Sequence, residues 1–144
     1  MQVKEIMSAG VECIQPSATL REAAQRMRDL DIGPLPVCGE DDRLAGIITD
    51  RDIAIRGVAE GLDPSTAVVR DVMTPKIIYC FEDQDISEAA RMMEDHQVRR
   101  LVVLNDEKRL VGILSLGDLA VDSGDELMAG HTLEAVSEPA GLRF

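Results

Sequence analysis

The pattern of hydrophobic and polar positions predicts one set of structural elements that occurs twice. In the first half of the chain, the apolar residues recur at the spacing of one helical face, so an amphipathic helix is expected there. These residues are Leu20, Ala23, Ala24, Met27 and Leu30. Two continuous apolar runs follow, separated by a polar turn, and such runs are typical of strands covered on both faces. The expected order is strand, helix, strand, strand, helix, at about residues 11–14, 20–30, 34–38, 44–49 and from 50 onward.

The second half of the chain repeats the first. When residues 71–122 are aligned with residues 5–56, a shift of 66 without gaps, 14 of 52 positions are identical in a single register. We therefore predict two copies of a β-α-β-β-α unit of the α/β (α+β) class. Because one copy is too small to bury its apolar face alone, the copies are expected to pack sheet to sheet with pseudo-two-fold symmetry. The predicted division is 1–62, 63–122 and a tail, 123–144, with a helix around 125–136.

The motif with the most chemical content is Gly-x-x-(Thr/Ser)-x-x-Asp, at 46–52 and again at 112–118, where a predicted strand runs into a predicted helix. A hydroxyl at a strand end before a helix N-terminus favours an anion, and the carboxylate three residues on can accept hydrogen bonds from vicinal sugar hydroxyls. A purely structural interpretation is also open, in which Thr49 or Ser115 caps the helix and the carboxylate complements the helix dipole. The occurrence of the motif twice, in register, favours a binding site.

The repeat and the duplicated motif resemble a tandem pair of CBS domains, the regulatory unit called a Bateman module, over about residues 3–122. The resemblance implies a protein without catalysis of its own, similar to small stand-alone tandem CBS proteins of bacteria. It implies binding of an adenine nucleotide or related adenosyl ligand (AMP, ADP, ATP, NAD or S-adenosylmethionine) in clefts between the units. That ligand is an effector rather than a required cofactor, and the protein acts in trans on a partner protein. A homodimer is also expected, through exposed apolar residues of the second helices: Ile53, Ile55, Leu119 and Val121.

Carried over residue by residue, the resemblance assigns two clefts. In the favoured cleft, Asp52 binds ribose hydroxyls, Thr49 faces the phosphate and arginines supply positive charge. Its ligand-binding residues are Thr49, Arg51, Asp52, Thr74, Ile78, Arg99 and Arg100. The weaker cleft holds Ser8, Val11, Ser115 and Asp118, facing the backbone of Gly33 and Pro34. In that cleft Gly117 replaces Arg51 and Gly33-Pro34 replaces Arg99-Arg100. In a chain of net charge −12 a cleft without arginine suits a phosphate poorly, so unequal occupancy is expected.

Composition narrows the alternatives. A net charge of −12, a pI near 4.5 and an aromatic content of 2% argue against a nucleic-acid or anionic-membrane partner. No apolar run approaches the ~20 residues of a membrane span, and no secretory signal is evident, so a cytoplasmic location is expected. The sequence shows no Ser-His-Asp or Cys-His grouping and no Walker motif, so no enzyme is predicted. The alternative functions are a ligand-free scaffold or a thiol redox switch built on the same fold.

The three cysteines, Cys13, Cys38 and Cys80, do not have the spacing of a metal site, and no metal is predicted. Their simplest interpretation is as small buried hydrophobic residues in a reducing compartment. Cys13 and Cys38 have a second interpretation, because adjacent strands would bring their Cα atoms near the ~4.4–6.8 Å that a disulfide needs. They are therefore a candidate redox pair.

Overall fold

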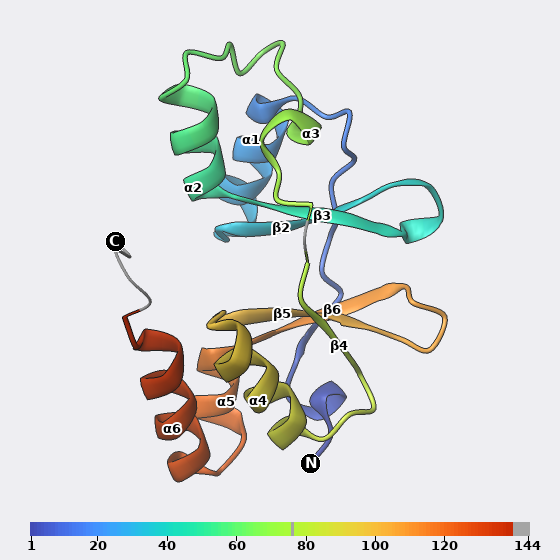
Figure 1. Cartoon of the computed structure of the whole chain (residues 1–144). Helices are drawn as coiled ribbons and strands as arrows, with labels where there is room; N and C mark the ends of the chain where they lie inside the picture. The colour runs from blue at the N-terminus through green and yellow to red at the C-terminus, as the bar shows by residue number, and fades with distance from the viewer. Residues whose placement is uncertain (76, 140–144) are drawn as a thin grey trace. The chain divides into compact units, whose positions relative to one another are not determined.

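The computed structural model describes residues 1–75 and 77–139, which form two compact units (Figure 1). Unit 2 is the continuous segment Glu12–Ile77, whereas unit 1 combines Met1–Val11 with the chain from Ile78 onward. Unit 1 thus contains most of the second copy of the repeat together with the start of the first copy. Unit 2 contains most of the first copy together with the start of the second. The predicted α+β class is confirmed, because each unit combines helices with a sheet.

Unit 2 is built on an antiparallel hairpin whose strands pair from Pro34↔Thr49 to Cys38↔Leu44. Its elements are α1 (Leu20–Leu30), β2 (Pro34–Cys38), the 3-10 turn η2 (Glu40–Asp42), β3 (Leu44–Thr49), α2 (Asp50–Asp52), the π-helix η3 (Ile53–Val58) and α3 (Val69–Val72). Of the face predicted for α1, Leu20, Ala23 and Met27 are buried in the core that contains Ile48 of β3. Ala24 and Leu30 are exposed, so the predicted face was too wide.

The strand predicted at 11–14 is reduced to one bridge, between Ile14 and Val37. Two backbone hydrogen bonds hold it, from the Ile14 N–H to the Pro36 carbonyl (2.9 Å) and from the Cys38 N–H to the Ile14 carbonyl (3.0 Å). Pro36 has no N–H, so it cannot donate the next bond of a parallel ladder, toward Glu12. The expectation of a full strand was therefore wrong at this place.

Unit 1 has a four-stranded sheet in the order β1-β6-β5-β4. Its elements are the 3-10 turn η1 (Val3–Glu5), β1 (Ser8–Ala9), β4 (Tyr79–Phe81), α4 (Ile86–His96), β5 (Arg100–Leu104), β6 (Leu110–Ser115), α5 (Leu116–Asp122) and α6 (Glu126–Ser137). Strand β4 pairs in parallel with β5 over three residues, from Tyr79↔Val102 to Phe81↔Leu104. Leu101, Leu114 and Leu119 are fully buried at the centre of this unit.

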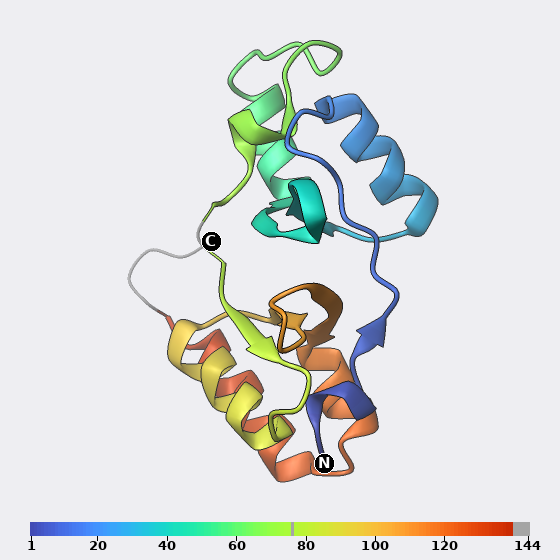
Figure 2. The ribbon, with the colours of Figure 1, turned by 90° about the vertical axis from the view of Figure 1, so that its right-hand side faces the viewer.

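The last helix, α6, confirms the helix predicted around residues 125–136, and it packs on α4 and α5. Figures 1 and 2 both show it alongside α4. Thr132 is fully buried, and its Oγ1 lies 3.0 Å from Glu94 Oε1. The Gln97 side-chain amide donates to the carbonyls of Ala135 (3.2 Å) and Glu138 (3.1 Å) at the end of the helix. Residues 140–144 of the predicted tail lie outside the described residues.

Candidate functional site

Both Gly-x-x-(Thr/Ser)-x-x-Asp motifs form the same turn from a strand into a helix. In unit 2 the Thr49 Oγ1 accepts a hydrogen bond from the Asp52 N–H, and the Asp52 Oδ2 accepts one from the Thr49 N–H, both at 3.0 Å. In unit 1 Ser115 and Asp118 repeat this exchange at 3.0 and 2.9 Å. Each pair is a capping box. The helix-capping role considered for these residues is therefore confirmed.

The capping box uses only part of each carboxylate. In both turns the bonded oxygen is Oδ2, which leaves Oδ1 outside the box. The Oδ1 of Asp52 lies 3.9 Å from the Nε of Arg56, and the Asp52 side chain is 15% exposed. A carboxylate oxygen can accept more than one hydrogen bond, so this side chain can hold the helix and still receive hydroxyl groups of a ligand.

The glycine of each motif allows a leading segment of chain to lie against the strand. A Cβ atom on Gly46 would stand 2.8 Å from the Thr74 carbonyl oxygen and 3.0 Å from the Met73 Sδ. A Cβ on Gly112 would stand 2.7 Å from both the Ser8 carbonyl oxygen and the Met7 Sδ. These distances are shorter than a side-chain carbon tolerates, so the close approach requires glycine.

In unit 2 the structure brings together four of the predicted ligand-binding residues. Thr74 pairs with Ile47, two residues before Thr49, through hydrogen bonds of 2.8 and 3.0 Å. Arg51 and Asp52 lie in the first helical turn after Thr49. Thr49, Asp52 and Thr74 are half-buried, and Arg51 is exposed. A strand edge, a turn and a helix start therefore contribute side chains to one part of this unit.

In unit 1 the structure brings together the residues of the predicted weaker cleft. Ser8 pairs with Ile113 on the edge of β6, and Ser115 and Asp118 form the turn that follows. Val11 ends the same N-terminal segment. Ile78, Arg99 and Arg100, which the sequence assigned to the favoured cleft, also belong to unit 1. Their association with a ligand held by Thr49 stays a prediction.

Arginines lie near both strand-to-helix turns, but different structural elements supply them in the two units. In unit 1 Arg100 pairs with Ser115, and the Arg99 carbonyl accepts from the Leu116 N–H (2.9 Å). In unit 2 the corresponding residues are Gly33 and Pro34, and the helix after the turn supplies the cations, Arg51 and Arg56.

Arg56 was missed by the sequence reasoning. Its Nη1 donates to the Val72 carbonyl (3.4 Å) besides pairing with Asp52. Its position four residues after Asp52, which places both side chains on one face of a helix, was the signal that could have found it.

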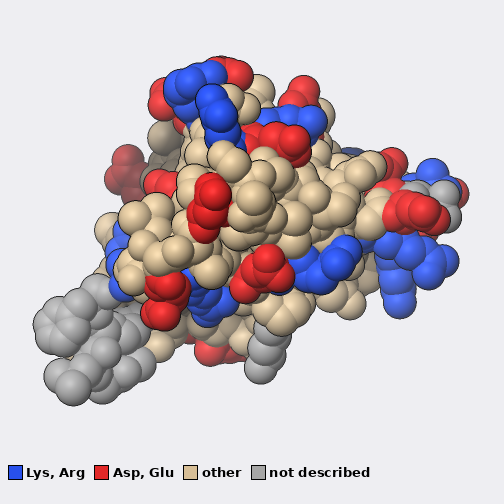
Figure 3. Space-filling model, turned by 90° about the horizontal axis from the view of Figure 1, so that it is seen from above, with Lys and Arg blue, Asp and Glu red and all other residues tan. Residues whose placement is uncertain are grey.

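Among the described residues no group of three or more His, Cys, Asp or Glu side chains is placed to hold a metal ion. No described helix is long and apolar enough to cross a membrane. On the face seen in Figure 3, Lys and Arg are interspersed with Asp and Glu instead of forming a continuous basic surface.

Comparison with known proteins decides the family. The family model of the CBS domain matches residues 3–57 and 69–121. The chain belongs to the CBS-domain family. It is 50% identical, over 117 residues and 81% of each chain, to hypoxic response protein 1 of Mycobacterium tuberculosis. The predicted resemblance to a tandem CBS pair of the stand-alone bacterial type is confirmed.

Two solved structures are similar to this CBS pair. One is Hypoxic Response Protein I with two coordinated zinc ions, at a TM-score of 0.77 and 47% identity, covering 85% of this chain and 98% of that chain. The other is the CBS domain pair of protein MJ0100 in complex with 5′-methylthioadenosine and S-adenosyl-L-methionine. It has a TM-score of 0.75 and 28% identity, covering 86% of this chain and 100% of that chain.

Proposed function

We propose that this CBS pair is a non-catalytic regulatory module that binds an adenosine-containing ligand at its strand-to-helix turns and signals occupancy to a partner protein. One observation carries the proposal: each turn presents a carboxylate that is fixed by a capping box through Oδ2 while its Oδ1 stays outside the box. Ribose carries vicinal hydroxyls, which are the donors such an oxygen accepts. The adenosyl compounds bound by the CBS pair of MJ0100 support this ligand class.

The arginines extend the proposal to phosphorylated ligands. Guanidinium groups bind phosphate oxygens in a bidentate, charge-assisted manner. Each turn has two arginines on neighbouring backbone, Arg51 and Arg56 in unit 2 and Arg99 and Arg100 in unit 1. The sequence analysis instead assigned Arg99 and Arg100 to the ligand held by Thr49 and Asp52. The two assignments therefore differ in whether Arg99 shares a ligand with Asp52 or with Asp118.

Ligand binding is tested by thermal unfolding and calorimetry of the reduced protein with AMP, ADP, ATP, NAD and S-adenosylmethionine. A ligand at 100 times its Kd adds about 2.7 kcal/mol to the free energy of unfolding, which raises Tm by several degrees. Asp52→Asn and Asp118→Asn keep the size of the side chain but remove its charge, and we expect each to lower affinity at its own turn. Asp71→Asn is the matched control, because Asp71 accepts from the Val68 N–H (3.2 Å) as an ordinary helix cap.

If the double variant of Asp52 and Asp118 binds every compound as the wild type does, the turns are not the site. If no compound binds to the wild type, the ligand-free scaffold becomes the better explanation, and partner proteins become the object of search. Arg99→Ala combined in turn with Asp52→Asn and with Asp118→Asn assigns the arginine, because groups that share a ligand give non-additive losses.

A homodimer and a cytoplasmic location belong to the same proposal. Of the four residues expected on the dimer surface, Ile55 (46% exposed) and Val121 (80% exposed) are available in the single chain. Leu119 is fully buried in the core of unit 1, so its predicted exposure was wrong; it occupies the inward face of α5. Ile53 packs against the core of unit 2. Light scattering of the wild type and of the variant Val121→Asp tests the dimer.

A further inference from the structure

Two of the three cysteines meet in unit 2. Cys13 precedes and Cys38 follows the two residues of the Ile14↔Val37 bridge, and the Cys38 N–H donates to the Ile14 carbonyl (3.0 Å). The Cys38 thiol lies close enough to the Cys13 thiol for the two groups to interact electrostatically. Both thiols are free. Backbone pairing that is already present in the reduced protein therefore places the two cysteines close to each other.

The two sulfurs differ in access. Cys13 is partly exposed, whereas Cys38 is 1% exposed. Both residues line a surface hollow of about 640 Å³ formed by the segment 13–18, helix α1 and the end of β2. A reagent that enters this hollow meets Cys13 first. The third cysteine, Cys80, is buried in the core of unit 1 and is absent from the hollow.

Burial also affects the protonation of Cys38. Burial, assisted by the contact with Cys13 and by the charge of Asp42, raises the pKa of Cys38 to about 12. At neutral pH Cys38 therefore carries its proton and is a poor nucleophile, because the thiolate is the reactive form. A protonated thiol such as Cys38 is suited to react second, after an oxidant has modified Cys13.

We propose that Cys13 and Cys38 form an oxidisable dithiol in which Cys13 reacts first with a small hydroperoxide and Cys38 then closes a disulfide. The Cys13 thiolate attacks the peroxide O–O bond, takes one oxygen as a sulfenic acid and releases an alkoxide or hydroxide, which gains a proton from water. The Cys38 sulfur then displaces the sulfenic oxygen. An S–S bond forms, an S–O bond breaks, and the proton of Cys38 leaves with that oxygen as water. Overall, two thiols and one hydroperoxide give one disulfide, one alcohol or water molecule, and one water molecule.

Charge around the hollow selects the reagent. The ionisable side chains of its lining other than the thiols are the carboxylates of Glu22, Asp29 and Asp42 and the guanidinium of Arg26. Arg26 is already engaged, since its Nη1 donates to the Cys13 carbonyl (2.9 Å) and pairs with Glu12 (3.7 Å). Asp29 is paired with Arg28 (3.0 Å), so Glu22 and Asp42 give the lining its negative charge, which repels anions. Uncharged hydroperoxides and cationic disulfides are therefore expected to react faster than anionic disulfides of equal intrinsic reactivity.

Peptide mass spectrometry tests the proposal directly, because trypsin places the cysteines on separate peptides, at 5–21, 29–43 and 77–91. We expect native protein treated with hydrogen peroxide to yield the 5–21/29–43 pair joined by a disulfide, with 77–91 left as a free thiol. The link is expected to disappear with dithiothreitol. A link between two copies of 5–21, modification of Cys80 at the same rate, or no linked peptide would each overturn the proposal.

Single variants test the order of reaction. In Cys38→Ala we expect Cys13 to accumulate as a sulfenic acid that dimedone traps. In Cys13→Ser we expect Cys38 to stay unmodified in the folded protein and to react only in urea. Cys13→Ser changes a partly exposed residue and keeps the test valid if Cys38→Ala fails to fold. Reaction of Cys38 at the wild-type rate in folded Cys13→Ser would contradict the order.

A charge series tests the selection of reagent. Cystamine, 2-hydroxyethyl disulfide and 3,3′-dithiodipropionate are dialkyl disulfides that are cationic, neutral and anionic. We expect mixed-disulfide formation at Cys13 to fall in that order, with rate differences that shrink in salt and in Glu22→Gln. If the three disulfides react with Cys13 at equal rates at low salt, the acidic lining does not select the reagent. Because the reaction needs no nucleotide, its failure leaves the proposed ligand function untouched, and the reverse also holds.

Discussion

The two units descend from the same repeat, but only one of them completes its sheet. Unit 1 joins four strands, whereas unit 2 has a two-stranded hairpin flanked by the single bridges Ile14↔Val37 and Ile47↔Thr74. On one side the difference follows from Pro36, because Val102 at the corresponding position has the N–H that a proline lacks. The comparison shows that a shared hydrophobic pattern sets which elements form, while individual backbone donors set how far they pair.

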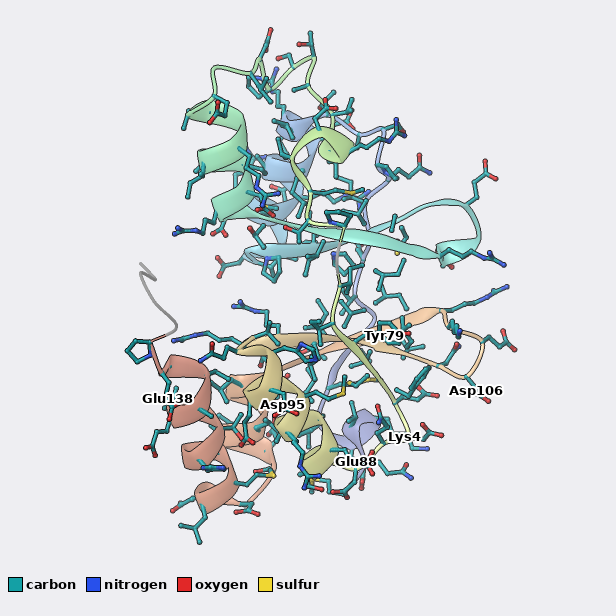
Figure 4. All side chains as sticks on the ribbon, in the orientation of Figure 1. Lys4, Tyr79, Glu88, Asp95, Asp106 and Glu138 are labelled. Carbon is teal, nitrogen blue, oxygen red and sulfur yellow. The ribbon has the colours of Figure 1, made fainter. Side chains whose placement is uncertain are left out.

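A second difference is the helix that covers unit 1 alone. Gln97, the residue after α4, donates its side-chain amide to carbonyls at the end of α6, and Glu94 of α4 contacts Thr132. In unit 2 the carboxylate of Asp31 stands in place of the Gln97 amide, and the guanidinium of Arg28 stands in place of the Glu94 carboxylate. Figure 4 shows Asp95 on α4 and Glu138 just after α6. Unit 2 therefore has no equivalent residues with which to bind such a helix.

The largest expected effect comes from filling the space at the motif glycines. We expect Gly112→Ala and Gly46→Ala to lower the free energy of unfolding by about 1–3 kcal/mol, because the new Cβ overlaps a backbone carbonyl of the leading segment. The loss is expected to be greater at Gly112, where both contacts are 2.7 Å and β1 pairs at two positions. Gly39→Ala is the control, since nothing lies within 4 Å of its Cβ. Urea unfolding measures the loss, and equal stability of all three variants would contradict the close approach.

Alkaline pH is expected to weaken unit 1 through Cys80, the counterpart of Ile14. Burial raises the pKa of Cys80 from 9.0 to about 11, so the folded chain keeps a proton that the unfolded chain releases. The free energy of unfolding therefore falls as the pH rises from 9.0 toward 11, by about 2 kcal/mol for this group. Cys80→Val removes this dependence, which urea unfolding at a series of pH values measures. The same alkaline loss in Cys80→Val and wild type would show that other groups cause it.

The smallest effects concern the attachment of α6. We expect Gln97→Glu to cost about 1 kcal/mol, because a carboxylate cannot donate to the carbonyls of Ala135 and Glu138. Asp31→Asn is the matched change in unit 2 and is expected to be nearly neutral. Gly130→Ala, whose Cβ meets nothing within 4 Å inside α6, is expected to stabilise by about 0.5–1 kcal/mol. The hydrogen-exchange rates of the α6 backbone amides measure these changes in stability. Unchanged exchange in Gln97→Glu would mean that the amide contacts do not hold the helix.

The sequence predicted the elements well because their causes are local. The helical face of Leu20, Ala23 and Met27 is visible without any tertiary information, as is the hydroxyl-to-carboxylate spacing of the capping boxes. The short pairing at Ile14 was not predicted, although Pro36 on the facing strand was a readable sign. For the candidate site, the sequence found Thr49, Asp52 and their counterparts. It did not reveal that Thr74 binds to the strand edge at Ile47, because that contact depends on a close approach far along the chain.

The division of unit 1 between the two ends of the chain has a consequence for biosynthesis. Unit 2 is continuous, so a ribosome releases all of it before most of unit 1 exists. The first residues of the chain have to wait, since Ser8 pairs with Ile113 and Gln2 with Asp85. Strand β1 consequently emerges first and is paired last, after about a hundred further residues have been translated. Until then its partner edge on β6 does not exist, and the N-terminal segment is the part of the nascent protein most available to other chains.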